Sequence, residues 1–373
     1  MTPNKNTAAS LSGLACILIL AVSIASGQER ETRIIVIANT IPEADGLMGV
    51  LGSADMRPPT IGAPKPAEKY IQAPGNPPAG LRGFYAAKGV TVEFWCVWEL
   101  PGAHGSPDGT RNKVMQLPNV IQPAGKVAPA MVVAFGTAAG HWESSYNGSV
   151  VVGSAVLLHS LHSSEDDVVT KALDGRGFKL DNIVESEKGW EFLRKAAFFK
   201  SSRAEIETKF LKPPLNPAAD PIVLLSPNRL GLGSINVTDP GDYAMADRET
   251  LDVALHAMSQ SPRTFEVGGV ETTHGLIRAF TPKDVPFIYV TAISNRLGYY
   301  PMELAPRRAA QHAAVVSNAG VVIAYLVDWV LRNPDQIAGL PERPGALLSR
   351  PQVQYDSSRS SSGLLSGLVA SRP

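Results

Sequence analysis

Short apolar runs that alternate with amphipathic stretches limit this chain to one class of fold. Residues 33–38, 128–135 and 285–293 are apolar at almost every position. Such runs are typical of strands that are buried on both faces of a sheet. Helices are expected in the stretches between and after them, at residues 185–212, 248–258, 271–280 and 304–331. Because strands and helices alternate, we predict an α/β fold: a single-domain, twisted, mixed but mainly parallel β-sheet flanked by helices.

The composition argues against a surface built for polyanions. Among 373 residues, 34 Lys and Arg balance 34 Asp and Glu, so we expect no nucleic-acid partner. A hydrophobic content of 44% suits one large core, which we assign to residues 28–335.

Residues 55–83, rich in Pro and Gly, are expected to form a long surface loop. Residues 336–373, rich in Pro, Ser and Arg, are expected to be a disordered tail.

The N-terminus has the organisation of an export signal. Lys5 precedes an apolar run from Leu11 to Ile24, and small residues follow from Ala25 to Gly27. We therefore expect a signal peptide over residues 1–27 and an exported protein, periplasmic or secreted. The alternative is an uncleaved anchor, but the apolar run is short for a bilayer span. No stable membrane span is expected after cleavage.

A run of small residues follows the second apolar strand. Gly136, Thr137, Ala138, Ala139 and Gly140 would let the backbone approach an anion closely, and the Thr137 hydroxyl can donate a hydrogen bond to it. The same residues would also suit a tight turn between a strand and a loop. The Gly-Lys-Ser/Thr ending of a P-loop is absent, so a nucleotide site of that kind is not expected.

Two other kinds of site are disfavoured. His159 and His162 precede acidic residues but lack a His-Glu-x-x-His pattern, so we predict no metal site. Neither Gly-x-Ser-x-Gly nor Gly-x-Gly-x-x-Gly occurs, which argues against a serine hydrolase and a dinucleotide-binding protein. We therefore expect no cofactor.

Several segments of the chain resemble, in the same order, motifs of the nucleoside phosphorylase and nucleosidase superfamily, which includes purine nucleoside phosphorylases and methylthioadenosine nucleosidases. Residues 41–44 follow the first strand like the Pro-Glu-Glu turn of that family. Residues 136–140, followed by an apolar strand, are similar to its phosphate or water turn. Residues 270–274 and 285–295 resemble its acidic ribose-binding segment and the late strand whose end meets the purine. The resemblance covers roughly residues 33–332.

The resemblance implies a role for each polar residue of these segments. Asn295 would hydrogen-bond the purine, since an amide both donates and accepts but, unlike Asp, cannot protonate the base. Glu43 would activate or orient the nucleophile, and Glu271 would hold the ribose hydroxyls. In an alternative register Thr273 stands where the ribose-binding carboxylate belongs; Phe265 would pack on the base or the ribose. Structural alternatives remain open, because Asn favours strand ends and Glu favours the first turn of a helix.

Together these segments imply an exported homo-oligomer that cleaves the N-glycosidic bond of a purine-type nucleoside. Asn295 matches the Asn-bearing phosphorolytic branch, so phosphorolysis is slightly favoured over hydrolysis, with inorganic phosphate as the co-substrate. The candidate phosphate ligands are Arg82, Arg111, Arg229 and Arg296. His274 lies close to the expected site, although a structural role is commoner for a histidine on a helix face. The alternative function is an exported protein of the same fold that binds a nucleoside without cleaving it.

Overall fold

The computed structural model describes most of the expected domain. The described residues are 32–52, 78–87, 89–103, 109–140, 146–160, 168–180, 182–195, 198–218, 220–238 and 266–333. Five predictions lie outside them: the signal peptide at 1–27, the helix at 248–258, Phe265, His162 and the tail at 336–373. Most of the predicted loop at 55–83 also lies outside.

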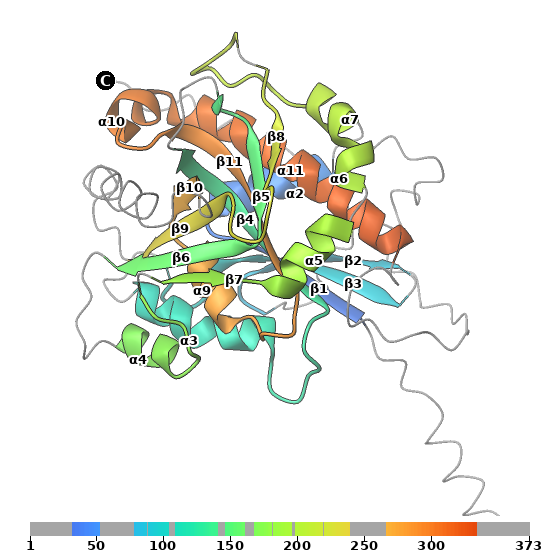
Figure 1. Ribbon diagram of the computed structural model, residues 1–373, viewed down its shortest axis with the longest axis vertical. Coiled ribbons are helices and arrows are strands. Elements are labelled where there is room, and N and C mark those ends of the chain that lie inside the picture. Colours follow the sequence, from blue (N-terminus) through green and yellow to red (C-terminus); the bar gives the residue numbers. More distant parts are fainter. Residues whose placement is uncertain are drawn as a thin grey trace, which may run out of the picture.

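One mixed sheet organises the described residues (Figure 1). Eight of its eleven strands follow the order β2-β3-β1-β4-β10-β9-β6-β7. Of the other three, β11 pairs with β4 and β5, and β8 pairs with β5. The strands are β1 (Thr32–Ala38), β2 (Leu81–Ala87), β3 (Val90–Cys96), β4 (Met131–Gly140), β5 (Val150–Gly153), β6 (Ala155–Ser160), β7 (Ile183–Glu185), β8 (Val223–Leu225), β9 (Gly233–Thr238), β10 (Val267–Glu271) and β11 (Phe287–Arg296). At the centre, β3, β1, β4 and β11 run parallel, whereas β10 meets β4 in the antiparallel direction.

Helices cover both faces of this sheet. They are α2 (Ile41–Gly52), α3 (Gly109–Ile121), α4 (Val168–Asp174), α5 (Glu187–Lys195), α6 (Phe198–Ser201), α7 (Arg203–Thr208), α9 (His274–Phe280), α10 (Tyr300–Glu303) and α11 (Arg308–Arg332). One core lies between the sheet and α2 and α11, and a second lies between the sheet and α3 and α9 (Figure 1). The α/β fold that the sequence predicts is confirmed.

The continuous apolar run of β4 follows from these two cores. Val133 and Phe135 point into the core under α2 and α11, whereas Val132 and Ala134 point into the core under α3 and α9. A strand covered on both faces needs apolar residues at successive positions. The helix α11 is long and apolar enough to span a membrane by composition. However, 94% of its most apolar 18-residue stretch is buried inside the protein, as in a core helix.

Three local predictions differ from the structure. Residues 136–140 form no turn, because β11 pairs with β4 along that length, as far as Arg296 opposite Gly140. The helix predicted from Glu271 begins at His274, since Glu271 still belongs to β10. The stretch 185–212 contains three short helices, α5, α6 and α7, instead of one.

Candidate functional site

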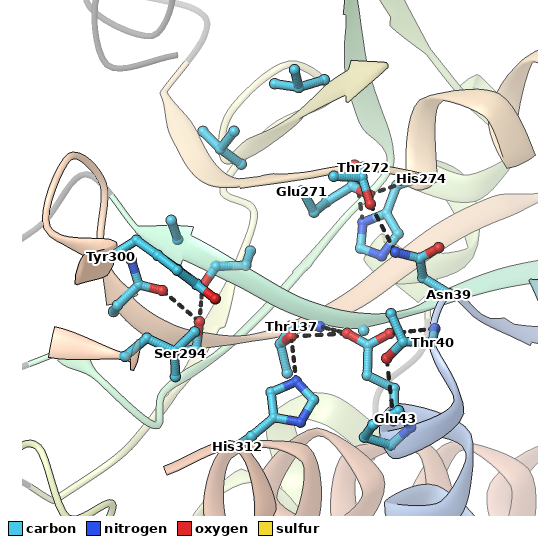
Figure 2. A pocket seen from close by; sticks show the side chains of 18 of the residues that line it. Asn39, Thr40, Glu43, Thr137, Glu271, Thr272, His274, Ser294, Tyr300 and His312 are labelled. Atoms are coloured by element: carbon cyan, nitrogen blue, oxygen red, sulfur yellow. Dashed lines mark hydrogen bonds and ion pairs between the residues drawn. The ribbon is translucent and has the colours of Figure 1, made fainter. Parts of the chain in front are cut away.

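A cavity of about 170 Å³ opens near the carboxyl ends of β1, β4, β10 and β11. Ligands of open α/β sheets bind in such crevices, because the loops and helix ends there present polar groups. The polar residues that line it are Asn39, Thr40, Glu43, Thr137, Glu271, Thr272, His274, Ser294, Asn295, Tyr300, Arg308 and His312. Figure 2 shows three groups around the cavity: one at Glu43, one at Glu271 and one at Ser294.

Glu43 holds its carboxylate against the backbone of β4. It lies in the first turn of α2 and is only 3% exposed. Its Oε2 accepts the backbone N–H of Thr40 at 2.9 Å, as in a capping box. Its Oε1 accepts both the backbone N–H of Thr137, at 2.7 Å, and the Thr137 hydroxyl, at 2.8 Å. Since β1 pairs with β4 only as far as Ala38, the carboxylate takes a backbone donor of β4 that β1 leaves unpaired.

His312 extends these contacts from α11. Its Nε2 lies 3.1 Å from Thr137 Oγ1. Because the Thr137 hydroxyl donates its proton to Glu43, the imidazole fits as the donor to the threonine oxygen. Burial lowers the pKa of His312, the nearby positive charge of Arg308 lowers it further, and Glu43 opposes both. The three side chains therefore form a hydrogen-bonded chain along one wall of the cavity (Figure 2).

Asn295 lines the opposite part of the cavity and is 2% exposed. The pairing of β11 with β4 shifts between Ile293 and Asn295, an irregularity of the kind that redirects side chains near functional sites. Its Oδ1 accepts the Ser294 hydroxyl at 2.8 Å, and its Nδ2 donates to the carbonyl of Arg296 at 2.8 Å. An amide has two N–H groups and two lone pairs, so one donor and one acceptor position remain for a ligand.

Glu271 is a buried carboxylate bound to the start of α9. Its Oε2 accepts the backbone N–H of Thr273, at 2.5 Å, and of His274, at 2.7 Å; its Oε1 accepts the Ser234 hydroxyl at 3.1 Å. Burial raises the pKa of Glu271 to about 7, with a smaller contribution from Glu43, although these three hydrogen bonds lower it. The predicted ribose ligand is therefore also the N-terminal cap of a helix.

Thr273, the alternative ribose ligand, turns away from the cavity. It is fully buried, and its hydroxyl donates to Asn39 Oδ1 at 2.5 Å. Asn39 in turn donates from Nδ2 to Thr272 Oγ1 at 2.8 Å. These contacts join the loop after β1 to the loop before α9, so Thr272 and Asn39, and not Thr273, face the cavity.

The structure brings together most of the residues predicted for the site. The predicted residues that line the cavity are Asn295, Glu43, Glu271, Gly136, Thr137, Ala138 and Ala139. Gly140 is not among the lining residues; a Cβ there would lie 2.8 Å from the Ile293 side chain. Phe265 lies outside the described residues. The segment 136–140 thus lines the cavity as the last part of strand β4 and not as an anion-binding turn.

Other lining residues were missed by sequence reasoning. Asn39 and Thr40 carry a usable signal, because polar residues that directly follow a buried strand often face the ligand crevice. Arg308 and His312 carry none, since they begin a long apolar helix far along the chain from the other segments.

The candidate phosphate arginines lie elsewhere. Arg82 pairs with Asp45 and Glu99, Arg229 with Glu185 and Glu187, and Arg296 with Glu303. None of these three, nor Arg111, lines the cavity, whereas Arg308 does. Within the described ranges, no group of three or more His, Cys, Asp or Glu side chains could hold a metal ion.

Comparison with known proteins gives matches only among solved structures. No protein-family model and no curated protein matches the sequence. The 5′-methylthioadenosine/S-adenosylhomocysteine nucleosidase of Campylobacter jejuni is 10% identical, with 81% of this chain and 99% of that chain covered and a TM-score of 0.45. The futalosine hydrolase of Helicobacter pylori is 12% identical, with 79% of this chain and 97% of that chain covered and a TM-score of 0.44. The 5′-methylthioadenosine nucleosidase of Arabidopsis thaliana is 14% identical, with 81% of this chain and 97% of that chain covered and a TM-score of 0.45.

These proteins are members of the nucleoside phosphorylase and nucleosidase superfamily. It is the superfamily that the sequence resembles. At such identities and TM-scores the likeness carries no activity over to this chain.

Proposed function

We propose that the protein hydrolyses the N-glycosidic bond of a purine-type nucleoside. The observation that carries this proposal is the buried carboxylate of Glu43, which faces the same cavity as the Asn295 amide. Cleavage of this bond needs a nucleophile at C1′ and a partner for the negative charge that develops on the leaving base. Glu43 suits the first need as a base toward water, and Asn295 suits the second as a hydrogen-bond donor.

The contacts of Thr137 favour water over phosphate as the nucleophile. The sequence slightly favours phosphorolysis, with the backbone and hydroxyl of Thr137 as phosphate donors. Both donors are directed at Glu43 Oε1, at 2.7 and 2.8 Å. A phosphate dianion at this position would lose these donors and meet a negative charge, which costs free energy in a buried site. Water has neither disadvantage.

Asn295 would stabilise the leaving base by hydrogen bonds, because it has no proton to give to the base as a general acid. Asn295 keeps one N–H for a ring nitrogen and one lone pair for a donor on the base. Ser294 fixes the amide by its bond to Oδ1 at 2.8 Å. Glu43 takes one proton from the attacking water, and the departing base gains one from solvent, so the overall reaction consumes one water molecule.

Base release with and without phosphate tests this proposal. The purified protein would be incubated with inosine, adenosine and methylthioadenosine, and the free base followed. We expect release in phosphate-free buffer and no acceleration when phosphate is added. Release that depends on phosphate would instead support phosphorolysis, and it would require Glu43 to leave Thr137.

A second candidate is a protein that binds a nucleoside without cleaving it. Its support is the hydrogen bonding of Glu271, whose carboxylate caps α9 instead of being free for the ribose, together with an amide at position 295 where an acid could have protonated the base. Titration calorimetry with the same nucleosides separates the two functions. Tight binding without base release would favour this candidate and contradict hydrolysis.

A further inference from the structure

Gly136 separates two acceptor atoms that belong to different groups of the site. A Cβ atom at Gly136 would lie 3.1 Å from Glu43 Oε1 and 3.5 Å from His274 Nε2. Both residues line the cavity. The bare side of Gly136 therefore faces a carboxylate oxygen and an imidazole nitrogen at once, and only glycine leaves this space open.

The ring of His274 is held so that Nε2 faces Gly136. His274 is the first residue of α9 and is 1% exposed. Its ring stacks on Tyr289 with a centroid distance of 5.6 Å, and its Nδ1 lies 3.4 Å from Ser234 Oγ and 3.7 Å from Glu271 Oε1. Burial lowers the pKa of His274 to about 3, so the ring is neutral and has one N–H and one lone pair.

Ser234 favours one of the two tautomers of the His274 ring. Its hydroxyl donates to Glu271 Oε1, so its oxygen is left as an acceptor 3.4 Å from Nδ1. This acceptor favours the tautomer with the proton on Nδ1. In that tautomer Nε2 has a free lone pair directed at the gap beside Gly136.

We propose that His274 Nε2 and the Glu43 carboxylate together hold the attacking water beside Gly136. This inference rests on the hydrolytic function proposed above. A water molecule that donates one proton to each acceptor has its lone pairs directed away from both, toward the cavity where C1′ of a nucleoside would lie. Attack forms the C1′–O bond as the C1′–N bond breaks and its electron pair leaves with the base. One water proton passes to Glu43. The other stays on the new hydroxyl, which donates a hydrogen bond to His274 Nε2.

The sharpest test compares two amide substitutions at position 274. In His274→Gln the amide reaches toward the position of Nε2, whereas in His274→Asn it reaches only toward Nδ1 and its contacts with Ser234 and Glu271. If His274 orients water, the His274→Gln variant should retain more activity than the His274→Asn variant. We expect the kcat of His274→Asn to fall about 100-fold, as for a misplaced reacting group, with KM changed little. A merely structural histidine would give the opposite order.

A second variant tests the space between the two acceptors. Gly136→Ala would place a methyl group 3.1 Å from Glu43 Oε1 and 3.5 Å from His274 Nε2, where it obstructs a water held by both. We expect kcat to fall, with at most a modest loss of melting temperature. The matched control is Gly49→Ala in α2, where a Cβ would meet nothing within 4 Å and activity should be unchanged.

The outcomes separate this inference from the function on which it rests. No base release by the wild-type protein would overturn both. Wild-type release with an unchanged kcat in His274→Asn and Gly136→Ala would overturn the inference alone. A rise in KM at constant kcat, greatest for nucleosides with an intact ribose, would assign His274 to a sugar hydroxyl and also overturn it.

Discussion

Glu43 Oε1 accepts two hydrogen bonds from Thr137, one from its backbone N–H at 2.7 Å and one from its hydroxyl at 2.8 Å. This contact joins the first turn of α2 to the edge of β4 and fixes the carboxylate at the cavity. It also uses the two donors that a phosphate would have needed. In the reaction proposed above, the choice between water and phosphate therefore depends on one residue pair.

The substitution Glu43→Gln tests the base. Glutamine keeps the size of the side chain and a carbonyl oxygen for Thr137, but it cannot take a proton from water and its NH₂ group cannot accept the Thr40 N–H. We expect kcat to fall about 100- to 10,000-fold, the range for loss of a general base, with a modest fall in melting temperature from the lost contact with Thr40. Glu191→Gln is the control, because Glu191 forms a partly exposed pair with Lys188 outside the cavity. Equal kcat values for Glu43→Gln and the wild type would rule out Glu43 as the base.

The substitution Asn295→Ala tests the contact with the leaving base. It removes the one N–H and the one lone pair that remain for a ligand. We expect a loss of kcat/KM of about 10- to 100-fold, equivalent to one or two hydrogen bonds in a buried site. Asn182→Ala, at an exposed position outside the cavity, is the control. Activity that persists in Asn295→Ala would show that the base is held elsewhere.

The raised pKa of Glu271 predicts a pH-dependent stability. Burial raises its pKa to about 7 in the folded protein, from an ordinary value of 4.5, so the folded state binds more protons between these values. The contribution of the protonated carboxyl is complete below about pH 4.5 and is lost as the pH rises through 7. The shift corresponds to about 3 kcal/mol of unfolding free energy.

Urea unfolding of the wild type and Glu271→Gln at pH 5 and pH 8 measures this contribution. The glutamine does not titrate, so its stability relative to the wild type should be higher at pH 8 than at pH 5. The groups that face the carboxyl are Glu43 from α2, His274 from α9, Tyr289 from β11 and Ser234 from β9. A stability difference that is the same at both pH values would mean that Glu271 keeps an ordinary pKa.

The packing of α5 on the sheet predicts a severe effect at Gly189. A Cβ there would lie 1.8 Å from the backbone carbonyl oxygen of Phe287 at the start of β11. Neither backbone can move without disturbing the core, so Gly189→Ala should destabilise the protein by at least about 3 kcal/mol. Gly52→Ala, where a Cβ would meet nothing within 4 Å, should change the unfolding free energy little. Thermal unfolding of both variants measures the difference.

The sequence predicted the fold better than it predicted the local structure of the site. Successive apolar residues in β1, β4 and β11 record that the sheet is covered on both faces, and this property is local to each strand. The backbone of residues 136–140 was predicted wrongly as a turn. Small residues suit a turn, but the partner strand β11 is more than a hundred residues away in the chain and keeps this segment extended.

Residue identity by itself determined which groups could do chemistry. It supplied the carboxyl of Glu43, the amide of Asn295 and the absence of a titratable proton at position 295. Tertiary structure decided how those groups are used. It directed Glu43 at Thr137, turned Thr273 away, tied Glu271 to α9 and placed His274 and Glu43 on the bare side of Gly136. Hydrogen-bond partners, burial and pKa depend on distances between strands and helices far apart in the chain, and those distances exist only after the sheet has formed.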